Sequence, residues 1–429
     1  MTAPLAALAT LAAPALSIWL ARRARLGKED PARLGERRGI GGLERPAGRL
    51  LWIHGASVGE ARSVLPLLNL ILDTHRGAQA LVTTGTLASA RMLADALPSR
   101  ARHQFAPLDV PAWVARFLDH WRPDAALWVE SELWPNMLAA LATRGVPAAL
   151  VNARLSQRSF DTWRRAAPLL RPPLGAFARV LAQSEADAAR FAALGAHDVA
   201  MPGNLKFDAA ILPADVAALA SLRAALAGRP CWLAASTHAG EEEIAAAAHQ
   251  ELEPSFPGLL TIVVPRHAPR GEEIAAMLSA RGLRHARRGR GELPGADTQV
   301  YVADTMGELG LFYRLAPIAF IGRSLARGGG QNPLEAAALG AALLAGPQTG
   351  NFRDIYDLLA AAGGVRIVAD GAALGAALGA LLADTDARAA IAARAGAATA
   401  AGRGATTRAL AALGGILAAL DAPDGDARA

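Results

Sequence analysis

Residues 50–73 read LLWIHGASVGEARSVLPLLNLILD, and the change of pattern within this stretch decides the fold. Residues 50–54 form a short apolar run that ends at Gly55, which is typical of a strand buried on both faces. Residues 56–60 predict a turn, and residues 61–73 continue as a helix. A strand, a turn and a helix in this order are the first unit of an α/β fold with a parallel sheet.

The same alternation continues along the chain and restarts after about residue 205. In the first half we predict strands at 80–84, 125–129, 148–152 and 180–183, with helices at 88–97 and near 135–144. In the second half we predict strands at 231–235, 259–264, 301–303, 318–321 and 342–344, helices at 241–250 and around 272–281, and largely helical stretches at 371–382 and 385–420. The pattern predicts two Rossmann-like units that meet at a seam near residues 202–213. Their parallel sheets would face a central cleft lined by the carboxyl ends of the strands, where such sheets bind ligands.

Composition limits the class of protein before any motif is considered. The 429 residues are 52% hydrophobic and 19% charged, which excludes a disordered chain and a coiled coil and suggests two or three globular domains. The single cysteine, Cys231, excludes an internal disulfide and a cysteine-based zinc site, and the nine histidines show no ligand spacing, so we expect no metal. The net charge of +6 predicts an anionic partner: nucleic acid, a phospholipid surface or a phosphorylated substrate. An aromatic content of 5% argues against base stacking.

The N-terminus carries an uncharged stretch followed by a basic one. Residues 4–20 (PLAALATLAAPALSIWL) contain no charge and match the shortest membrane spans, and four basic residues follow within residues 21–28. A signal peptide would place its basic residues before the apolar run, whereas this order predicts an anchor whose basic flank stays in the cytoplasm. The alternative is a buried or interfacial alanine-rich helix, because Pro14 and the alanines weaken a span. In either case the basic flank can bind anionic headgroups.

Two motifs of the first half place carboxylates after predicted strands. Residues 54–60 (HGASVGE) open a helix, and Glu60 in its first turn could accept a proton from a substrate hydroxyl or could merely complement the helix dipole. Residues 128–136 (WVESELWPN) hold Glu130 and Glu132 on either side of a serine. Acidic residues at the start of a helix are also common as caps, so each motif alone leaves both interpretations open.

Other motifs predict contacts with anions. Residues 152–159 (NARLSQRS) place Arg154 and Arg158 four residues apart at a strand end, where guanidiniums suit a phosphate or a carboxylate, although solvated surface charge would have the same pattern. In the second half, four loops follow strands: residues 235–241 (ASTHAGE), 265–267 (PRH), 304–309 (DTMGEL) and 328–335 (GGGQNPLE). Backbone amides, hydroxyls and Arg266 would hold phosphate there, and a glutamate one turn into the last helix could accept both hydroxyls of a ribose. The loops predict a nucleotide site, but their spacing matches neither a dinucleotide fingerprint nor a P-loop.

Together these motifs resemble the 3-deoxy-D-manno-octulosonic acid (Kdo) transferases of lipopolysaccharide synthesis. The resemblance covers nearly the whole chain in the same motif order. It rests on residues 52–60 (WIHGASVGE), 130–136 (ESELWPN), 152–159 (NARLSQRS), 203–208 (GNLKFD), 265–267 (PRH), 306–309 (MGEL) and 329–335 (GGQNPLE). It implies a GT-B-type fold of two Rossmann-like domains. It also implies an inverting glycosyltransferase that moves Kdo from CMP-Kdo to the lipid A precursor (lipid IVA) without a metal or other cofactor.

The resemblance also implies how the chain divides into parts. Residues 1–30 would be the hydrophobic anchor and its basic flank, at the cytoplasmic face of the inner membrane. Residues 31–205 would bind the lipid A precursor, residues 206–385 would bind CMP-Kdo, and residues 386–429 would be helices that pack back toward the first domain. The expected partners are CMP-Kdo, the lipid A precursor and the anionic inner-membrane surface, with no nucleic acid.

By the same resemblance, Glu60 aligns with the catalytic base, which would deprotonate the 6′-hydroxyl of the lipid A disaccharide. Glu130 and Lys206 would support the transition state. The expected acceptor-side residues are Ser57, Gly59, Glu132, Arg154 and Arg158. The expected donor-binding residues are Ser236, Thr237, Arg266, His267, Met306, Gly307, Glu308, Gly330, Asn332, Pro333, Leu334 and Glu335. Because the nucleotide is already a good leaving group, one base would suffice.

Three positions depart from the pattern of the family. Gln331 and Gln348 stand where the family usually has histidine, and Arg323 stands where it usually has glycine. Glutamine can donate a hydrogen bond but cannot titrate, so we expect no proton transfer at those two positions. The departures concern contacts with the donor and not the class of reaction.

Alternative functions belong to other classes. A lipid A disaccharide synthase or a nucleotide-sugar 2-epimerase would share the fold, but neither predicts ESELWP together with NARLS. A non-catalytic, membrane-tethered nucleotide-binding module would not need the loops of the first half.

Overall fold

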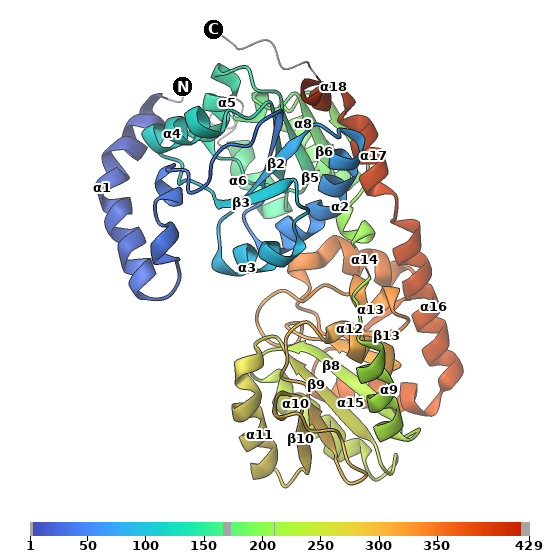
Figure 1. Ribbon diagram of the computed structural model, residues 1–429. Helices are drawn as coiled ribbons and strands as arrows, with labels where there is room; N and C mark the ends of the chain where they lie inside the picture. The colour runs from blue at the N-terminus through green and yellow to red at the C-terminus, as the bar shows by residue number, and fades with distance from the viewer. Residues whose placement is uncertain (1–2, 166–172, 210, 422–429) are drawn as a thin grey trace. The chain divides into compact units, whose positions relative to one another are not determined.

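The computed structural model describes residues 3–165, 173–209 and 211–421, and these residues form two compact units (Figure 1). The N-terminal unit comprises the described residues up to 209 together with those from 402 onward. The C-terminal unit comprises residues 211–401. The chain therefore leaves the first unit, builds the second, and returns to the first.

The N-terminal unit is built on a parallel sheet of seven strands in the order β3-β2-β1-β4-β5-β6-β7. The strands are β1 (Leu50–His54), β2 (Gln79–Thr84), β3 (Ala101–Phe105), β4 (Ala125–Val129), β5 (Ala148–Ala153), β6 (Arg179–Ala182) and β7 (Val199–Ala200). The chain moves outward from β1 to β3 and then crosses back to β4, so the strand order reverses between β1 and β4. In open α/β sheets, ligands bind at the carboxyl ends of the strands beside this switch point.

Helices cover both faces of this sheet (Figure 1). They are α2 (Val58–Thr74), α3 (Leu87–Ala96), α4 (Pro111–Trp121), α5 (Pro135–Thr143), α6 (Gln157–Arg165), α8 (Glu185–Ala193), α17 (Ala405–Ala412) and α18 (Gly414–Leu417). Successive residues of β1 point to opposite faces: Leu51 and Ile53 pack in a core that includes α2 and α17, whereas Trp52 packs in a core that includes α4 and α5. Burial on both faces explains why β1 has no polar alternation.

The C-terminal unit repeats the plan with seven parallel strands in the order β10-β11-β9-β8-β12-β13-β14. The strands are β8 (Cys231–Thr237), β9 (Leu260–Pro265), β10 (His285–Arg287), β11 (Val300–Val302), β12 (Ile318–Ile321), β13 (Ala342–Ala345) and β14 (Val365–Ile367). The helices are α9 (Val216–Leu226), α10 (Glu241–Leu252), α11 (Gly271–Ala280), α12 (Leu309–Leu315), α13 (Leu334–Ala338), α14 (Arg353–Ala361), α15 (Gly371–Ala383) and α16 (Thr385–Ala401). The strand order reverses between β8 and β12, so the carboxyl ends of these two strands mark the second expected ligand site.

The two parallel sheets predicted from the sequence are confirmed, and the strands that the prediction missed lie at or next to sheet edges. These are β3, β7, β10 and β14. β3 (ARHQF) and β10 (HAR) are partly exposed and polar, so they lack the apolar run that identifies a buried strand.

The predicted helical stretch 385–420 is interrupted in the structure. α16 ends at Ala401, and Gly404, with φ +84°, precedes α17. A Cβ atom at Gly402 would collide with the ring of Phe207, so glycine lets the chain turn there. α16 belongs to the C-terminal unit, so the return to the first unit begins at residue 402, later than the expected residue 386. Residues 422–429 lie outside the described residues.

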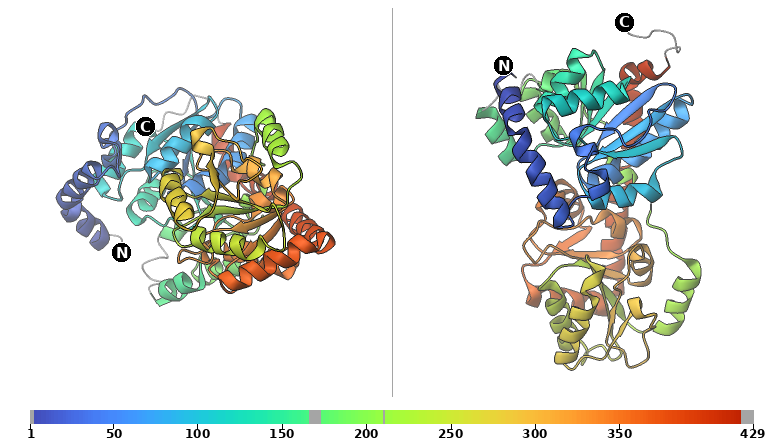
Figure 2. Two further views of the ribbon diagram at one scale, coloured as in Figure 1. Left: turned by 90° about the horizontal axis from the view of Figure 1, so that it is seen from below. Right: turned by 60° about the vertical axis from the view of Figure 1, so that its left-hand side comes forward.

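The N-terminal apolar stretch forms helix α1 (Ala3–Arg25), which continues through Pro14. By length and composition, it is the one helix in the described parts of the chain that could cross a membrane, with a mean hydropathy of 1.5 over its most apolar window. α1 runs along the outside of the N-terminal unit (Figure 2). Leu20 is buried against Trp113 of α4, whereas Leu11 is 80% exposed. The helix therefore packs by one face and leaves apolar side chains on another.

Candidate functional site

Glu60 lies in the first turn of α2, directly after the carboxyl end of β1. Ser57 caps this helix, since its Oγ accepts the backbone N–H of Glu60 at 3.3 Å. In return, the Glu60 carboxylate accepts the Ser57 hydroxyl and the Ala56 N–H, each at 2.7 Å. This reciprocal arrangement resembles a capping box, so the carboxylate is held in a defined position by the start of its own helix.

Burial raises the pKa of Glu60 to about 7. The negative charge of Glu130 raises this pKa further, as does that of Glu132, and the hydrogen bond from Ser57 opposes them. A carboxyl group with a pKa near neutrality is a far better general base than an exposed carboxylate, because its conjugate acid is weaker. Capping and acid–base chemistry, which the sequence left as alternatives, are therefore compatible at this residue.

Glu130 follows β4 across the switch point from β1, with a left-handed backbone (φ +62°). Its N–H donates to the carbonyl of Val151 at 3.0 Å, and its Oε1 lies 2.5 Å from Nζ of Lys206. The two side chains are only 16% and 14% exposed. A carboxylate that raises the pKa of Glu60 is thus itself paired with a lysine. The structure brings together the three residues expected to be catalytic.

A chain of buried amides positions Lys206. The Asn204 side chain accepts the Lys206 N–H at 2.9 Å and donates to Gln183 at 3.0 Å. Gln183 donates to the Asn152 carbonyl at 2.8 Å, and the Asn152 side chain accepts the N–H of Leu205 at 3.0 Å. Sequence reasoning missed Gln183 and Asn204. One sequence feature could have identified them: each is a side-chain amide at or shortly after the end of an apolar strand, where a buried polar group needs a hydrogen-bond partner.

The acidic loop after β4 is fixed by a residue that the sequence analysis also missed. Asp109 accepts the backbone N–H groups of Asn136 at 3.1 Å and Met137 at 2.8 Å, which caps α5. Within the loop, Nε1 of Trp134 donates to Glu132 at 2.6 Å. Asp109 therefore orders the segment that carries Glu130 and Glu132.

The remaining acceptor-side residues lie at the same edge of the sheet. Ser57 and Gly59 start α2, and Arg154 follows β5. Arg154 is half-buried and Arg158, in the first turn of α6, is exposed. The two arginines are thus placed near the carboxyl end of β5, as the sequence predicted.

In the C-terminal unit, β8 ends in an irregular turn. The register with β9 shifts between Ala235 and Thr237, and Ser236 has φ +55°. Thr237 is buried, and its hydroxyl donates to Glu242 at 2.8 Å. Of the two hydroxyls expected near the donor, that of Thr237 is therefore engaged within the protein.

Glu241 fills the backbone cradle that we had expected to hold phosphate. Its carboxylate is buried and accepts the His238 N–H at 3.0 Å. It also accepts the N–H groups of Arg323 (2.6 Å), Ser324 (2.9 Å), Leu325 (3.0 Å) and Ala326 (3.3 Å). The expectation that backbone amides after residue 235 bind an anion therefore fails for His238, because the protein supplies the carboxylate itself.

The loops after β9 and β12 approach each other through histidine and glutamine. Arg266 and His267 are exposed after β9, and the rings of His267 and His238 are 5.8 Å apart. Nε2 of Gln331 lies 3.2 Å from Nε2 of His238. Gln331, one of the departures from the family pattern, thus forms part of this cluster.

The segment after β11 presents Met306, which is 70% exposed, beside Gly307 with φ +85°. Glu308 accepts two hydrogen bonds from Arg288, at 2.6 and 3.1 Å, and one from Thr305. The bond from Arg288 holds the pKa of Glu308 below its usual range. Arg288 was not predicted, and it keeps this carboxylate ionised and in place.

The glycine-rich loop leads into α13. Gly330 is buried with φ +79°, and a Cβ atom there would lie 3.0 Å from the carbonyl oxygen of Gln348. Asn332 accepts the N–H of Leu334 at 3.1 Å, which starts the helix, and Glu335 lies half-buried in its first turn. Pro333 and Leu334 are buried. The loop is thus held closely, with Asn332 and Glu335 at its helix end.

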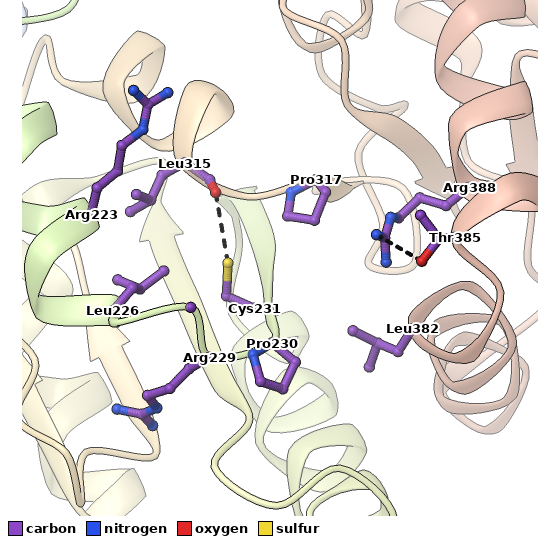
Figure 3. A pocket seen from close by; sticks show the side chains of 11 residues that line it. Arg223, Leu226, Arg229, Pro230, Cys231, Leu315, Pro317, Leu382, Thr385 and Arg388 are labelled. Carbon is purple, nitrogen blue, oxygen red and sulfur yellow. Dashed lines mark hydrogen bonds between the residues drawn. The ribbon is translucent and has the colours of Figure 1, made fainter.

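A separate cavity of about 460 Å³ lies at the opposite edge of the second sheet, where β8 and β12 begin (Figure 3). Cys231 and Arg388 are among the residues that line it, and none of the expected donor-binding residues does. The Cys231 thiol donates to the carbonyl of Leu315 at 3.7 Å, and burial raises its pKa to about 11. Its position places this cavity away from the loops described above.

Comparison with known proteins identifies relatives along nearly the whole chain. Residues 32–209 match the family described as 3-deoxy-D-manno-octulosonic-acid transferase (kdotransferase). The 3-deoxy-D-manno-octulosonic acid transferase of Bordetella pertussis is 39% identical over 417 residues, which cover 94% of this chain and 96% of that protein. The enzyme of the same name from Haemophilus influenzae is 35% identical over 337 residues, 78% of this chain and 79% of that protein.

Solved structures share the fold. The UDP-GlcNAc 2-epimerase of Neisseria meningitidis, bound to UDP-GlcNAc, superposes with a TM-score of 0.56 over 85% of this chain and 99% of that chain, at 14% identity. The C-terminal CMP-Kdo binding domain of WaaA from Acinetobacter baumannii is 36% identical, covers 42% of this chain and 96% of that domain, and has a TM-score of 0.41. At 14% identity the epimerase shows the GT-B-type fold and nothing of the reaction.

Proposed function

Because this chain belongs to the 3-deoxy-D-manno-octulosonic acid (Kdo) transferase family, we propose that it moves Kdo from CMP-Kdo to a lipid A precursor with Glu60 as the general base. Kdo transfer in lipopolysaccharide biosynthesis is the activity of its relatives, and the chain is a glycosyltransferase. The observation that carries the assignment of the base is the raised pKa of Glu60 at the carboxyl end of β1.

The proposed reaction is a single displacement. An acceptor hydroxyl attacks the anomeric carbon of Kdo while Glu60 takes its proton, and the bond from that carbon to the phosphate oxygen of CMP breaks. The electron pair of this bond leaves with CMP, so the configuration at the anomeric carbon is inverted. The pKa of about 7 supports this role, because a useful fraction of Glu60 is ionised at neutral pH and can still hold a proton.

Glu130 and Lys206 would support this step through charge. Glu130 keeps Glu60 basic, because its negative charge disfavours a second carboxylate nearby. Lys206 offsets part of that charge at 2.5 Å and would stabilise negative charge that develops on the reacting oxygens. Both roles depend on the geometry of the ion pair.

The donor would bind to the loops of the C-terminal unit. Arg266 is exposed after β9 and would neutralise a nucleotide phosphate, and Glu335, half-buried in the first turn of α13, would accept ribose hydroxyls. We infer that cations of the protein take the place of a metal ion at the leaving group. Among the described residues, no group of three or more His, Cys, Asp or Glu side chains is arranged to hold a metal.

The acceptor would reach the enzyme from a membrane. Leu8, Leu11 and Ile18 expose apolar side chains along α1, and Arg22 and Arg25 follow in its last turn. An apolar face next to arginines suits an anionic lipid surface, so we propose attachment at the cytoplasmic face of the inner membrane. Arg154 and Arg158 would then contact phosphates of the lipid A precursor.

Product mass analysis tests this proposal. The purified chain is incubated with CMP-Kdo and a tetraacylated lipid A precursor, with and without a metal chelator. We expect the lipid to gain the mass of at least one Kdo in both cases, with release of CMP. A lipid of unchanged mass would contradict the acceptor assignment, and loss of activity with the chelator would contradict metal independence. Conversion of a nucleotide sugar without any acceptor would favour an epimerase.

A further inference from the structure

Arg323 adopts a backbone conformation that disfavours its own side chain. It follows β12 and Gly322, and its φ of +58° lies in the left-handed region, where glycine is favoured. By the resemblance described in the sequence analysis, the family usually has glycine at this position. An unfavourable backbone conformation at a loop of a binding site points to a functional reason for the side chain.

The turn at Arg323 is fixed by Glu241. The buried Glu241 carboxylate accepts the N–H of Arg323 at 2.6 Å together with those of the three following residues and of His238. These amides would otherwise form an anion-binding nest, but a carboxylate of the protein already occupies it. An anionic ligand at this edge of the sheet must therefore be bound by side chains.

Among the residues that the structure describes, no carboxylate pairs with the Arg323 guanidinium. Its side chain is half-buried, and it makes no hydrogen bond or ion pair with any residue that the structure describes, whereas Arg287 and Arg288 of the same unit bind Asp304 and Glu308. A Cβ atom at Gly328 would collide with the Arg323 side chain, so this glycine makes room for it. A partly desolvated cation without a carboxylate is unfavourable until an anion binds it.

Two arginines and a second histidine, from the loops after β9 and β12, lie beside His238. Burial lowers the pKa of His238, and the charge of Arg323 is the next largest cause. Glu241 raises this pKa, and His267 and Arg266 lower it further. Gln331 adds an amide 3.2 Å from the His238 ring. The charge of Glu241 opposes the charges of Arg323 and Arg266. Two guanidiniums against one carboxylate leave this cluster with a net positive charge.

We propose that Arg323 binds the phosphate of the donor nucleotide, as an additional cation that this chain carries in place of the usual glycine. The inference rests on the proposed function, which supplies a cytidine nucleotide as the ligand. It assigns a specific role to a residue that the sequence analysis had identified only as a departure from the family pattern.

Calorimetric titration with CMP and with cytidine tests this assignment. Arg323→Gln removes the charge and keeps most of the side-chain length. We expect the CMP affinity to fall about ten-fold, in line with the loss of a charge-assisted contact, and the cytidine affinity to stay unchanged. Arg327→Gln, an exposed arginine of the same loop, is the matched control and should bind both ligands as the wild type does.

A second variant separates binding from folding. Arg323→Gly relieves the left-handed conformation, so its melting temperature should not fall, while its CMP affinity should fall as in Arg323→Gln. Equal CMP affinity in the wild type, both Arg323 variants and Arg327→Gln would overturn the assignment, even in an enzyme that transfers Kdo. A wild type that transfers no Kdo and binds no CMP would instead overturn the proposed function, and the assignment with it.

Discussion

The Nζ atom of Lys206 lies 2.5 Å from Oε1 of Glu130, although the two residues are 76 positions apart in the chain. The pair is largely buried, and the charge of Glu130 raises the pKa of Glu60. The ionisation of Glu60 is therefore coupled to an ion pair that the fold assembles from the loop after β4 and the turn at residues 205–208.

The pH dependence of the reaction should report this coupling. Because Glu60 must be ionised to accept a proton and its pKa is about 7, kcat/KM for the acceptor should rise with pH and level off above about 7. Measurement of kcat/KM between pH 5 and pH 9 checks this. A rate that is constant across that range would contradict the assignment of the base.

Substitutions in the ion pair should move the pH profile in opposite directions. Glu130→Gln removes a negative charge that raises the pKa of Glu60, so its profile should shift to lower pH. Lys206→Met leaves the Glu130 charge without its lysine, so its profile should shift to higher pH. Shifts in the same direction would show that the two residues do not act on Glu60 through charge.

Protein stability should depend on pH through the same carboxyl group. The pKa of Glu60 is about 7 in the fold against an ordinary value of 4.5. The folded state therefore holds this proton more tightly, and its contribution to stability is full below pH 4.5 and is lost as the pH rises through 7. Glu60→Gln does not ionise, so its advantage in stability over the wild type should grow from pH 5 to pH 8, by at most roughly 3 kcal/mol.

Melting temperatures of the wild type and Glu60→Gln at the two pH values measure this difference. Glu44→Gln, at an exposed position of the same unit, is the control and should show no comparable growth. If Glu60→Gln and the wild type are equally stable at pH 8, the ionised Glu60 carboxylate does not lower the free energy of unfolding.

The buried amide chain should matter for rate more than for donor binding. Asn204→Ala leaves the Lys206 N–H and Oε1 of Gln183 without these partners, which costs about 1–3 kcal/mol and loosens the turn that carries Lys206. We expect kcat to fall about ten-fold with little change in the affinity for CMP. Asn204→Asp keeps the acceptor for the Lys206 N–H and should recover part of the rate. Identical kcat values in the two variants and the wild type would contradict a positioning role.

Sequence reasoning was sufficient for the presence of two parallel sheets and for many of the residues at their carboxyl ends. The apolar runs of β1, β4, β8 and β12 identify buried parallel strands, whereas the order of the strands in each sheet was seen only in the structure. Edge strands such as β10 have too few apolar residues to stand out from loops. The break at Gly402 depends on the approach of Phe207, which sequence periodicity does not contain.

The supporting contacts of the site were less accessible from the sequence. Glu60 and Glu130 stood out because each follows a strand and lies at or before the start of a helix, but Lys206 was named only through the family resemblance. The pairing of Glu130 with Lys206 joins distant segments, which the sequence pattern does not contain. Asp109 and Gln183 act through tertiary hydrogen bonds, and their residue types are common in loops. In the sequence, Glu241 looks like one of the acidic residues that commonly begin a helix. Only the fold shows that its carboxylate occupies the backbone nest at Arg323.

Membrane binding should depend on the exposed face of α1. Leu11 is 80% exposed, and a charge there would have to enter the lipid, so Leu11→Asp should weaken sedimentation with vesicles that contain anionic phospholipid. Ala94→Asp adds the same charge at an exposed position of α3 and should sediment as the wild type does. Equal sedimentation of the two variants would exclude this face of α1 as the contact.

The most direct test of the central claim is the transfer rate of Glu60→Gln measured beside its affinity for CMP. The variant keeps hydrogen-bonding capacity next to Ser57 and the Ala56 N–H but cannot take a proton at neutral pH. The account predicts that Kdo transfer to the lipid acceptor is lost while CMP binds as tightly as to the wild type. Transfer at the rate of the wild type would contradict it.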